Sequence, residues 1–246
     1  MNRIGITGSK GFIGSHIIDF LKNKKNVKLF FFDLPENNLL KPDEDLKKFV
    51  RNNNIIIHTA AVNRGSDAEI VAGSVVATYN LISAMVNFKS QSKLIFLSSI
   101  QAETETLYGQ SKRLTEIILE DFSNNYKVPV SIFRLTNVFG EGCRPFYNSA
   151  VATFCYQVVN NKELTVHPES KNRKMDLIYV GDIAKIVVRE AFIKRKKPFY
   201  FRRVVSRNEI TVGELAKLIQ SFKIKPIKRL KTKFYQDLYL TYRSYI

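Results

Sequence analysis

The stretch RIGITGSKGFIGSH, which runs from Arg3 to His16, leads from a short apolar run through a glycine-rich turn into a segment with helical spacing. Its glycines follow the pattern G-x-x-G-x-x-G. Glycine allows the backbone to approach a diphosphate closely, and the first amides of the following helix supply donors and positive potential. A tight turn without a ligand would use the same residues, but a strand before it and a helix after it favour dinucleotide binding. The predicted cofactor contacts here are Gly8, Lys10, Gly11, Phe12, Ile13 and Gly14.

Around this stretch, the first half of the chain alternates strand-like and helix-like segments. Near-continuous apolar runs predict strands at 3–7, 27–33, 54–60, 93–99 and 130–136. Helical spacing separates them at 12–23, at 68–88 and in a segment that begins near residue 108. Such alternation is typical of a parallel sheet with helices on both faces. The predicted fold class is therefore α/β, a Rossmann-like doubly wound parallel sheet with a small C-terminal substrate-binding lobe.

After about residue 137 the pattern is less regular. Helices are predicted at 147–161, 181–194 and 211–222, and short strands at 163–167 and 174–180. Thr211 and Glu214 match a capping box at the beginning of the last helix. Because no linker-like or repeated segment interrupts the chain, residues 1–246 are predicted to form one domain. Within it, residues 1–140 mainly bind the cofactor and residues 141–246 mainly bind the substrate.

The composition is that of a globular protein, with 45% hydrophobic and 25% charged residues, but the formal net charge is +17. A nucleic acid, a membrane surface or a phosphate-bearing substrate would account for this charge, and so would a lysine-rich composition. We favour composition, with part of the charge attracting a diphosphate. Basic runs at 194–197 and 228–233 come without aromatic–basic or zinc-finger motifs, so a nucleic acid partner is not expected.

The cellular setting is predicted from the apolar runs and the cysteines. No apolar run approaches the roughly 20 residues that span a bilayer, and a strand begins the chain, so neither a membrane partner nor a signal peptide is expected. Cys143 and Cys155 provide no disulfide framework, which favours a reducing, cytoplasmic location.

The choice of cofactor depends on two residues of opposite charge. Asp33 follows the last glycine by about 20 residues, at the end of the second predicted strand, where a carboxylate accepts hydrogen bonds from the adenosine ribose and favours NAD. Lys10 could instead pair with the 2′-phosphate of NADP. These residues alone leave the choice open.

The segment SSIQAETETLYGQSKRLTEIILE, at 98–120, carries the predicted reacting centre. Tyr108 and Lys112 lie four residues apart, on one face of a predicted helix. A tyrosine hydroxyl has a pKa near 10, and a neighbouring ammonium lowers it by stabilising the phenolate. The pair can then donate a proton to a carbonyl oxygen as a hydride reaches the carbon. This spacing is common by chance, but beside a dinucleotide site it favours proton transfer, with Ser98 or Ser99 holding the same oxygen.

Together these motifs resemble those of the extended short-chain dehydrogenase/reductases, over essentially the whole chain. TGSKGFIG, HTAAV, LSSIQA, YGQSK, RLTNVFG and YVGDIA occur in the order of that family. AAVNR, CRPFYNSAVATFCY and DLYLTYRSYI are similar to stretches of one branch, the reductases of N-acetyl-L-fucosamine synthesis for capsules and O-antigens. That branch reduces the C4 ketone of UDP-2-acetamido-2,6-dideoxy-4-ulose sugars with NADPH.

The resemblance implies a role for each matching residue. Tyr108 would be the catalytic acid, and Lys112 would lower its pKa and reach the nicotinamide ribose. Ala60 and Ala61 would line the cofactor. A UDP-sugar substrate, NADP(H) and a homodimer formed by the Tyr108 helix and its predecessor are also implied. The implied substrate contacts are Asn137, Arg144 and Asn148.

The sequence departs from this branch in two ways. Ile100 stands where the family has its active-site Ser or Thr, so Ser98, Ser99 or Gln101 would hold the carbonyl oxygen. Relatives commonly continue into a metal-binding cupin domain that inverts C3 before reduction. This chain stops at Ile246 and shows no cluster of histidines, so we expect no metal.

The predicted function is NAD(P)H-dependent 4-reduction of a UDP-2-acetamido-2,6-dideoxy-4-keto-hexose. One alternative is a bifunctional 3-epimerase/4-reductase with Cys143 as the base, although a buried structural cysteine is the simpler interpretation. His167 is a more distant candidate base, and His58, in an apolar strand, is expected in the core. Two rival interpretations are a nucleotide-sugar 4-epimerase that retains its cofactor and a redox-sensing NAD(P)-binding regulator without turnover.

Overall fold

The computed structural model describes residues 1–224 and 232–246, so most of the basic run at 228–233 lies outside the described residues. The chain divides into two compact units. The first comprises Met1–Leu135 and Ala184–Val204, and the second comprises Thr136–Ile183 and Val205–Ile246. Residues 184–204, in the range expected mainly for the substrate lobe, thus belong to the first unit, where they contribute most of a helix and an edge strand.

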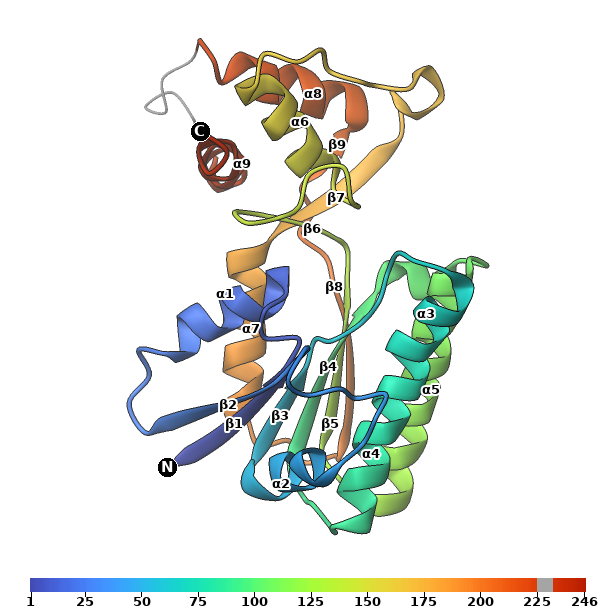
Figure 1. The fold of residues 1–246 in the computed structure, drawn as a ribbon. Coiled ribbons are helices and arrows are strands. Elements are labelled where there is room, and N and C mark those ends of the chain that lie inside the picture. Colours follow the sequence, from blue (N-terminus) through green and yellow to red (C-terminus); the bar gives the residue numbers. More distant parts are fainter. Residues whose placement is uncertain (225–231) are drawn as a thin grey trace. The chain divides into compact units, whose positions relative to one another are not determined.

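Six parallel strands form the sheet of the first unit, in the order β2-β1-β3-β4-β5-β8 (Figure 1). Residue Ile4 of β1 pairs with Leu29 on one side and with Ile55 on the other. The runs IIIH in β3 and LIFLS in β4 are buried throughout, as a sheet covered on both faces requires. The predicted Rossmann-like sheet is confirmed, and β8 is a strand that the sequence prediction missed. The strands are β1 (Asn2–Thr7), β2 (Val27–Phe32), β3 (Ile55–His58), β4 (Lys93–Ser99), β5 (Val130–Leu135) and β8 (Phe199–Val204).

Helices cover both faces of this sheet (Figure 1). On one face lie α1 (Phe12–Leu21) and α7 (Val180–Phe192), which belongs to this unit from Ala184 onward. On the other face lie α2 (Glu44–Asn52), α4 (Ala77–Asn87) and α5 (Leu107–Tyr126), which share one buried core with the strands. The sequence prediction missed α2, which begins where the Asp43 carboxylate accepts hydrogen bonds from the amides of Asp45 and Leu46.

A long apolar helical run leads into α4. Helix α3 (Asp67–Val71), a π-helical turn η1 (Ala72–Val76) and α4 are continuous, and these 21 residues contain a window of mean hydropathy 1.4. By length and composition the run could cross a membrane, so the expectation that no apolar run approaches that length was wrong. It is weak evidence for a membrane, because core helices of folded domains pass the same test and 39% of the window is buried within the protein.

The second unit contains a three-stranded sheet of β6 (Asn137–Phe139), β7 (Lys174–Tyr179) and β9 (Glu209–Thr211). Its helices α6 (Ala150–Val159), α8 (Val212–Ser221) and α9 (Lys233–Arg243) share an apolar core with these strands. The capping box predicted at the beginning of α8 is confirmed, since Thr211 and Glu214 exchange side-chain-to-amide hydrogen bonds. The strand predicted at 163–167 is wrong. Its alternating apolar residues, Leu164 and Val166, pack on the core of this unit from an irregular segment.

Candidate cofactor and catalytic site

The loop between β1 and α1 has a shape that depends on its glycines. Gly8 has a φ of +73°, and a Cβ there would lie 2.6 Å from the Ala60 nitrogen. A Cβ on Gly14 would lie 2.1 Å from the Gly8 carbonyl oxygen, so a larger residue would displace the loop. Gly11 begins α1 without a side-chain cap, and the first turn carries no acidic residue. The amides of that turn therefore suit a diphosphate, and the loop fits a dinucleotide.

This loop lies at the topological switch point of the sheet. The chain leaves β1 for β2 on one side, whereas β3 lies on the other side of β1. Ligands of doubly wound sheets bind at such a point, outside the carboxyl ends of the strands. The residues after β3 are tied to the loop, because the Thr59 hydroxyl lies 2.8 Å from the Thr7 carbonyl oxygen and 3.1 Å from that of Gly8. The predicted cofactor residues Ala60 and Ala61 follow directly.

Asp33, directly after β2, holds the glycine loop with its carboxylate. It accepts hydrogen bonds from the Gly8 amide at 3.1 Å, the Lys10 amide at 2.9 Å and the Ser9 hydroxyl at 2.5 Å. The Lys10 ammonium pairs instead with Glu36, at 2.9 Å, and its hydrogen bond lowers the pKa of the Glu36 carboxyl. A carboxylate therefore stands beside the loop, and the lysine of the loop already has an acidic partner.

Helix α5 carries Tyr108 and Lys112, and its beginning is positioned by a cap and by close packing. The Thr106 hydroxyl accepts a hydrogen bond from the Gly109 amide at 3.1 Å. A Cβ on Gly109 would lie 2.2 Å from the Gln101 carbonyl oxygen, so this turn packs tightly on the short 3₁₀ helix Ile100–Glu103. The tyrosine is thereby held beside the segment that follows β4.

Lys112 is only 3% exposed. Its ammonium donates to the Leu97 carbonyl of β4 at 3.2 Å and lies 4.7 Å from the centre of the Phe96 ring and 5.9 Å from that of the Tyr108 ring. Burial lowers the pKa of Lys112 from 10.5 to about 8, and the charge of Glu116 opposes this shift. An ammonium beside a half-buried tyrosine is the arrangement that the spacing of four residues predicts.

Glu116 extends the same face of α5 by one turn, and the sequence prediction missed it. Its carboxylate accepts hydrogen bonds from Ser98 at 2.6 Å, from Arg134 of β5 at 3.0 Å and from Arg113 at 3.2 Å. Burial opposes the charged carboxylate, but the hydrogen bonds from Arg134 and Ser98 lower the pKa of Glu116. The spacing of four residues between Lys112 and Glu116 is the sequence feature that could have identified Glu116. Its contact with Arg134 depends on how the strands of the sheet pair, which local spacing does not indicate.

The two serines at the end of β4 have different surroundings. Ser98 is 4% exposed, and its hydroxyl donates to Glu116. Ser99 points to the other face, as alternation along a strand requires, and its half-buried hydroxyl accepts from the Gln101 amide at 3.2 Å. Because Ser98 is engaged inside the fold, Ser99 and the exposed Gln101 are the better candidates to hold a substrate oxygen.

His58, at the end of β3, lies in the core as expected. Its Nδ1 and Nε2 atoms lie 2.6 Å and 2.9 Å from the hydroxyls of Thr7 and Thr78. The Thr78 hydroxyl donates to the Ser74 carbonyl, so Nε2 carries the ring proton and Nδ1 accepts from Thr7. Burial, together with the charge of Lys112, lowers the pKa of His58 to about 3. The ring is therefore neutral near pH 7. Its role is structural, because its two hydrogen bonds join the end of β3 to β1 and to α4 beside the switch point.

Three of the residues predicted to contact the substrate lie in the second unit, and Gln101 lies in the first. Asn137 begins β6, and its exposed side-chain amide donates to the Asp176 carbonyl at 3.3 Å. The Arg144 guanidinium lies 5.4 Å from the centre of the Tyr147 ring, and Asn148 is exposed nearby in the same loop. Their roles in substrate binding stay predictions.

Cys143, the candidate base for inversion of C3, is buried. Burial raises the pKa of its thiol, and a hydrogen bond with Ser149 offsets this only in part, so the thiol form is favoured. Cys155 is also buried, and both are free thiols. His167 lies exposed before a short 3₁₀ turn. No group of three or more His, Cys, Asp or Glu side chains that could hold a metal occurs in residues 1–224 and 232–246.

The chain is similar to known proteins in sequence and in fold. Residues 4–192 match the model of the NAD dependent epimerase/dehydratase family. Over 99% of its length, the chain is 30% identical to the UDP-2-acetamido-2,6-beta-L-arabino-hexul-4-ose reductase of Pseudomonas aeruginosa, and it spans 65% of the length of that relative.

Two solved structures illustrate the likeness. The capsular polysaccharide assembling protein CapF from Staphylococcus aureus has 31% sequence identity and a TM-score of 0.81, over 100% of this chain and 66% of that one. The UDP-glucuronic acid 4-epimerase from Bacillus cereus, in complex with NAD, has a TM-score of 0.86 over 98% of both chains. Its identity of 17% means that this second likeness shows the fold alone.

Proposed function

The chain belongs to the NAD dependent epimerase/dehydratase family, and on this premise we propose that it reduces the C4 ketone of a UDP-2-acetamido-2,6-dideoxy-4-keto-hexose with NAD(P)H. The observation that carries the proposal is the buried Lys112 ammonium beside the Tyr108 ring, in the unit that also holds the glycine loop. The similarity to the reductase of P. aeruginosa supports the substrate class. Because the chain spans 65% of that relative, the substrate itself is part of the proposal.

In the proposed reaction, the Tyr108 hydroxyl donates a proton to the C4 oxygen of the substrate. A reduced nicotinamide, when bound, supplies the hydride that C4 receives. The Lys112 ammonium stabilises the phenolate left on Tyr108, and Glu116 helps to keep Lys112 charged by raising its pKa. Ser99 or Gln101 holds the C4 oxygen as negative charge develops on it. Gly8, Gly11, Gly14 and the first amides of α1 would hold the diphosphate of the cofactor.

For the cofactor we propose NADH rather than the NADPH that resemblance implies. A 2′-phosphate beside Asp33 would bring like charges together, while Lys10 is paired with Glu36. The test compares kcat/KM for the two cofactors, and we expect NADH to be preferred. A preference for NADPH would contradict the proposal. In a Glu36→Gln variant, which removes the acidic partner of Lys10, kcat/KM is expected to rise for NADPH and to stay unchanged for NADH.

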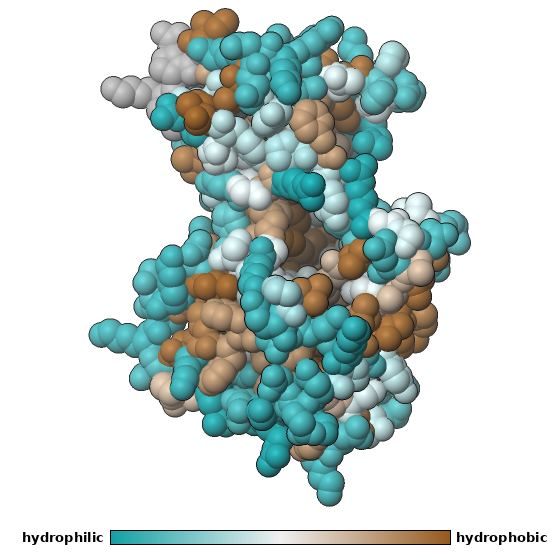
Figure 2. Space-filling view, in the orientation of Figure 1, coloured by the Kyte–Doolittle hydropathy of each residue, from teal (hydrophilic) through white to brown (hydrophobic). Residues whose placement is uncertain are grey.

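We also propose a homodimer formed through α4 and α5. Exposed apolar side chains follow one another at helical spacing along α5, and others lie in α4 and at the end of the π-helical turn before it. Figure 2 shows hydrophobic side chains gathered at the margin where α3 and α5 lie in Figure 1. A second copy would cover this surface by pairing the same two helices. The exposed side chains are Leu107, Leu114, Ile117, Val76 and Tyr79.

The function is tested by one incubation in deuterated water. Purified protein receives the UDP-2-acetamido-2,6-dideoxy-4-ulose with NADH or NADPH. The absorbance of the reduced nicotinamide is followed, and the product is examined by NMR. Consumption without deuterium at C3 supports a reductase alone, whereas deuterium at C3 supports the bifunctional enzyme, with Cys143→Ser as the next variant. No consumption with either cofactor would contradict the proposal. Tyr108→Phe, which keeps the ring but removes the proton donor, is the control.

A further inference from the structure

The turns that lead from helices into strands lie together at one edge of the first sheet. Because its strands are parallel, every such turn comes at their amino ends, opposite the glycine loop (Figure 1). Backbone hydrogen bonds of 2.8–3.0 Å join residues of these turns to the beginnings of neighbouring strands across this edge. They run from Asn2 to Asn26, from Asn54 to Arg3, from Lys93 to Asn54, from Leu94 to Pro129 and from Val130 to Pro198.

These turns carry only one sign of charge. They contain nine lysines and arginines, all exposed, and no aspartate or glutamate. The turns are 22–26, 53–54, 88–92, 127–129 and 193–198. We call their basic residues the basic edge: Lys22, Lys24, Lys25, Lys89, Lys127, Lys194, Arg195, Lys196 and Lys197.

A lysine-rich composition does not explain this distribution. The loops at the opposite edge of the same sheet have mixed charge, with acidic residues in the majority. A helix C-terminus favours a nearby cation, but that effect does not call for the four consecutive basic residues at 194–197. The charged residues of the opposite loops are Lys10, Asp33, Glu36, Lys41, Asp43, Arg64, Glu103 and Glu105.

We propose that the basic edge binds the surface of a membrane that contains anionic phospholipids. Six strands spaced about 4.8 Å apart make the edge a strip roughly 24 Å wide, which matches a flat layer of headgroups. All of its cations except Arg195 are lysines, which act as point charges on flexible stems and lack the fork that arginine uses to recognise nucleic acids. This inference revises the expectations that no membrane is a partner and that composition explains the charge.

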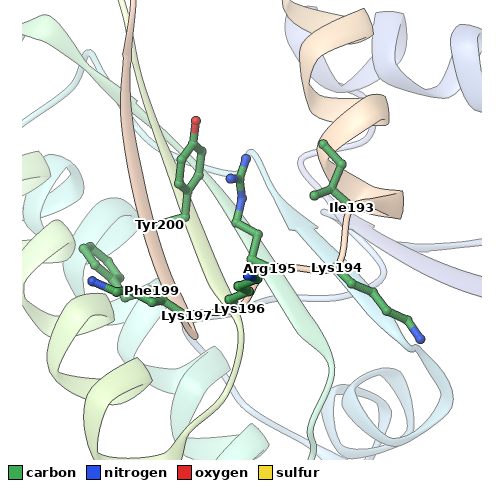
Figure 3. A pocket seen from close by; sticks show the side chains of 7 residues that line it. All are labelled: Ile193, Lys194, Arg195, Lys196, Lys197, Phe199 and Tyr200. Carbon is green, nitrogen blue, oxygen red and sulfur yellow. The ribbon is translucent and has the colours of Figure 1, made fainter.

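Side chains around the strip support the same partner. Tyr126 ends α5 and Phe192 ends α7, and they are 50% and 42% exposed next to the basic edge. Aromatic rings in such positions settle at the level of the headgroups. The loop 193–197, Phe199 and Tyr200 line a cavity of about 350 Å³. Figure 3 shows its lining side chains, and the lysines among them could receive one headgroup phosphate. Arg195 stacks on the Tyr200 ring and bonds Glu190, which orders this loop.

Vesicle co-sedimentation of the full chain tests the proposal. Binding is expected to vesicles of phosphatidylcholine mixed with phosphatidylglycerol, to weaken as salt is added, and to be absent for phosphatidylcholine alone. Each lysine near an anionic leaflet strengthens binding about fivefold, so changing Lys194, Lys196 and Lys197 to Gln is expected to weaken it about 100-fold. Arg195 is left in place because it bonds Glu190.

A matched control removes the same charge elsewhere. Changing the exposed Lys41, Lys162 and Lys217 to Gln also lowers the net charge by three, and binding is expected to stay near wild type. A second edge variant, with Lys24, Lys25 and Lys127 changed to Gln, is expected to behave like the first. Ketone reduction should be unchanged in all three, because none of these residues is among the proposed cofactor, catalytic or substrate contacts. Equal weakening by the control, binding to neutral vesicles, or tighter binding to duplex DNA than to anionic vesicles at the same salt would overturn the proposal.

Discussion

Replacing Lys112 with methionine is expected to abolish ketone reduction and yet to raise the free energy of unfolding. The ammonium is buried against the Leu97 carbonyl and the Phe96 and Tyr108 rings. Methionine is unbranched and flexible, so it fills similar space without placing a charge in the core. Tyr108 would then lack the cation that stabilises its phenolate, and proton transfer would fail.

The magnitude follows from the pKa of Lys112, which burial lowers from 10.5 to about 8. The folded protein therefore binds this proton less tightly than the unfolded chain does, by roughly 3 kcal/mol. Below pH 8 the lysine is charged in both states and the whole penalty is present, so Lys112→Met is expected to be more stable by up to about 3 kcal/mol at pH 7. Between pH 8 and 10.5 the unfolded chain binds more protons, the wild type gains stability as pH rises, and the difference shrinks to about 1 kcal/mol near pH 9.5.

Urea unfolding of the cofactor-free protein, followed by circular dichroism at both pH values, measures this difference. Lys217→Met, at an exposed position of α8, is the control and is expected to show no advantage that depends on pH. If Lys112→Met is less stable than the wild type at pH 7, or if its advantage does not fall at higher pH, then burial does not destabilise the charged lysine as argued.

Three further variants test the surroundings of the reacting centre. Ser98→Ala removes a donor from the buried Glu116 and is expected to cost about 1–2 kcal/mol of stability with little change in kcat. Ser99→Ala is expected to lower kcat about 100- to 1,000-fold and, because its hydroxyl also accepts from the Gln101 amide, to cost about 1 kcal/mol of stability. Unfolding and kinetics are measured for both variants, and a larger loss of kcat in Ser98→Ala would contradict the assignment. Glu116→Gln removes the charge that raises the pKa of Lys112, so the alkaline limb of the pH profile of kcat/KM is expected to move to lower pH, and an unmoved limb would contradict that coupling. Ile117→Asp puts a charge in the proposed dimer surface, and light scattering is expected to show a monomer that is folded but no longer pairs.

Local features were predictable because they involve few consecutive residues. The glycine loop is recognisable from a single turn between a strand and a helix. The pair Tyr108 and Lys112 is recognisable from its spacing of one helical turn. The sheet followed from the apolar runs of its inner strands. The edge strand β8 was missed because three consecutive residues of FYFRRV, at 201–203, are exposed and two of them are arginines, which interrupts the apolar pattern. Helix α2 was missed because only Leu46, Phe49 and Val50 of its nine residues are buried.

What the sequence by itself determined was therefore the fold class, the position of the cofactor loop and the candidate proton donor, since each depends on local spacing. Only the tertiary structure distinguished Ser98 from Ser99 as a candidate to hold the substrate oxygen. The distinction depends on which of the two faces α5, and that face is set by the packing of the helix on the sheet. It alone joined Arg134 to Glu116, through the pairing of β5 with β4. The net charge of +17 was evident from composition, but its concentration along one edge follows from parallel strands, which bring turns far apart in sequence into one row.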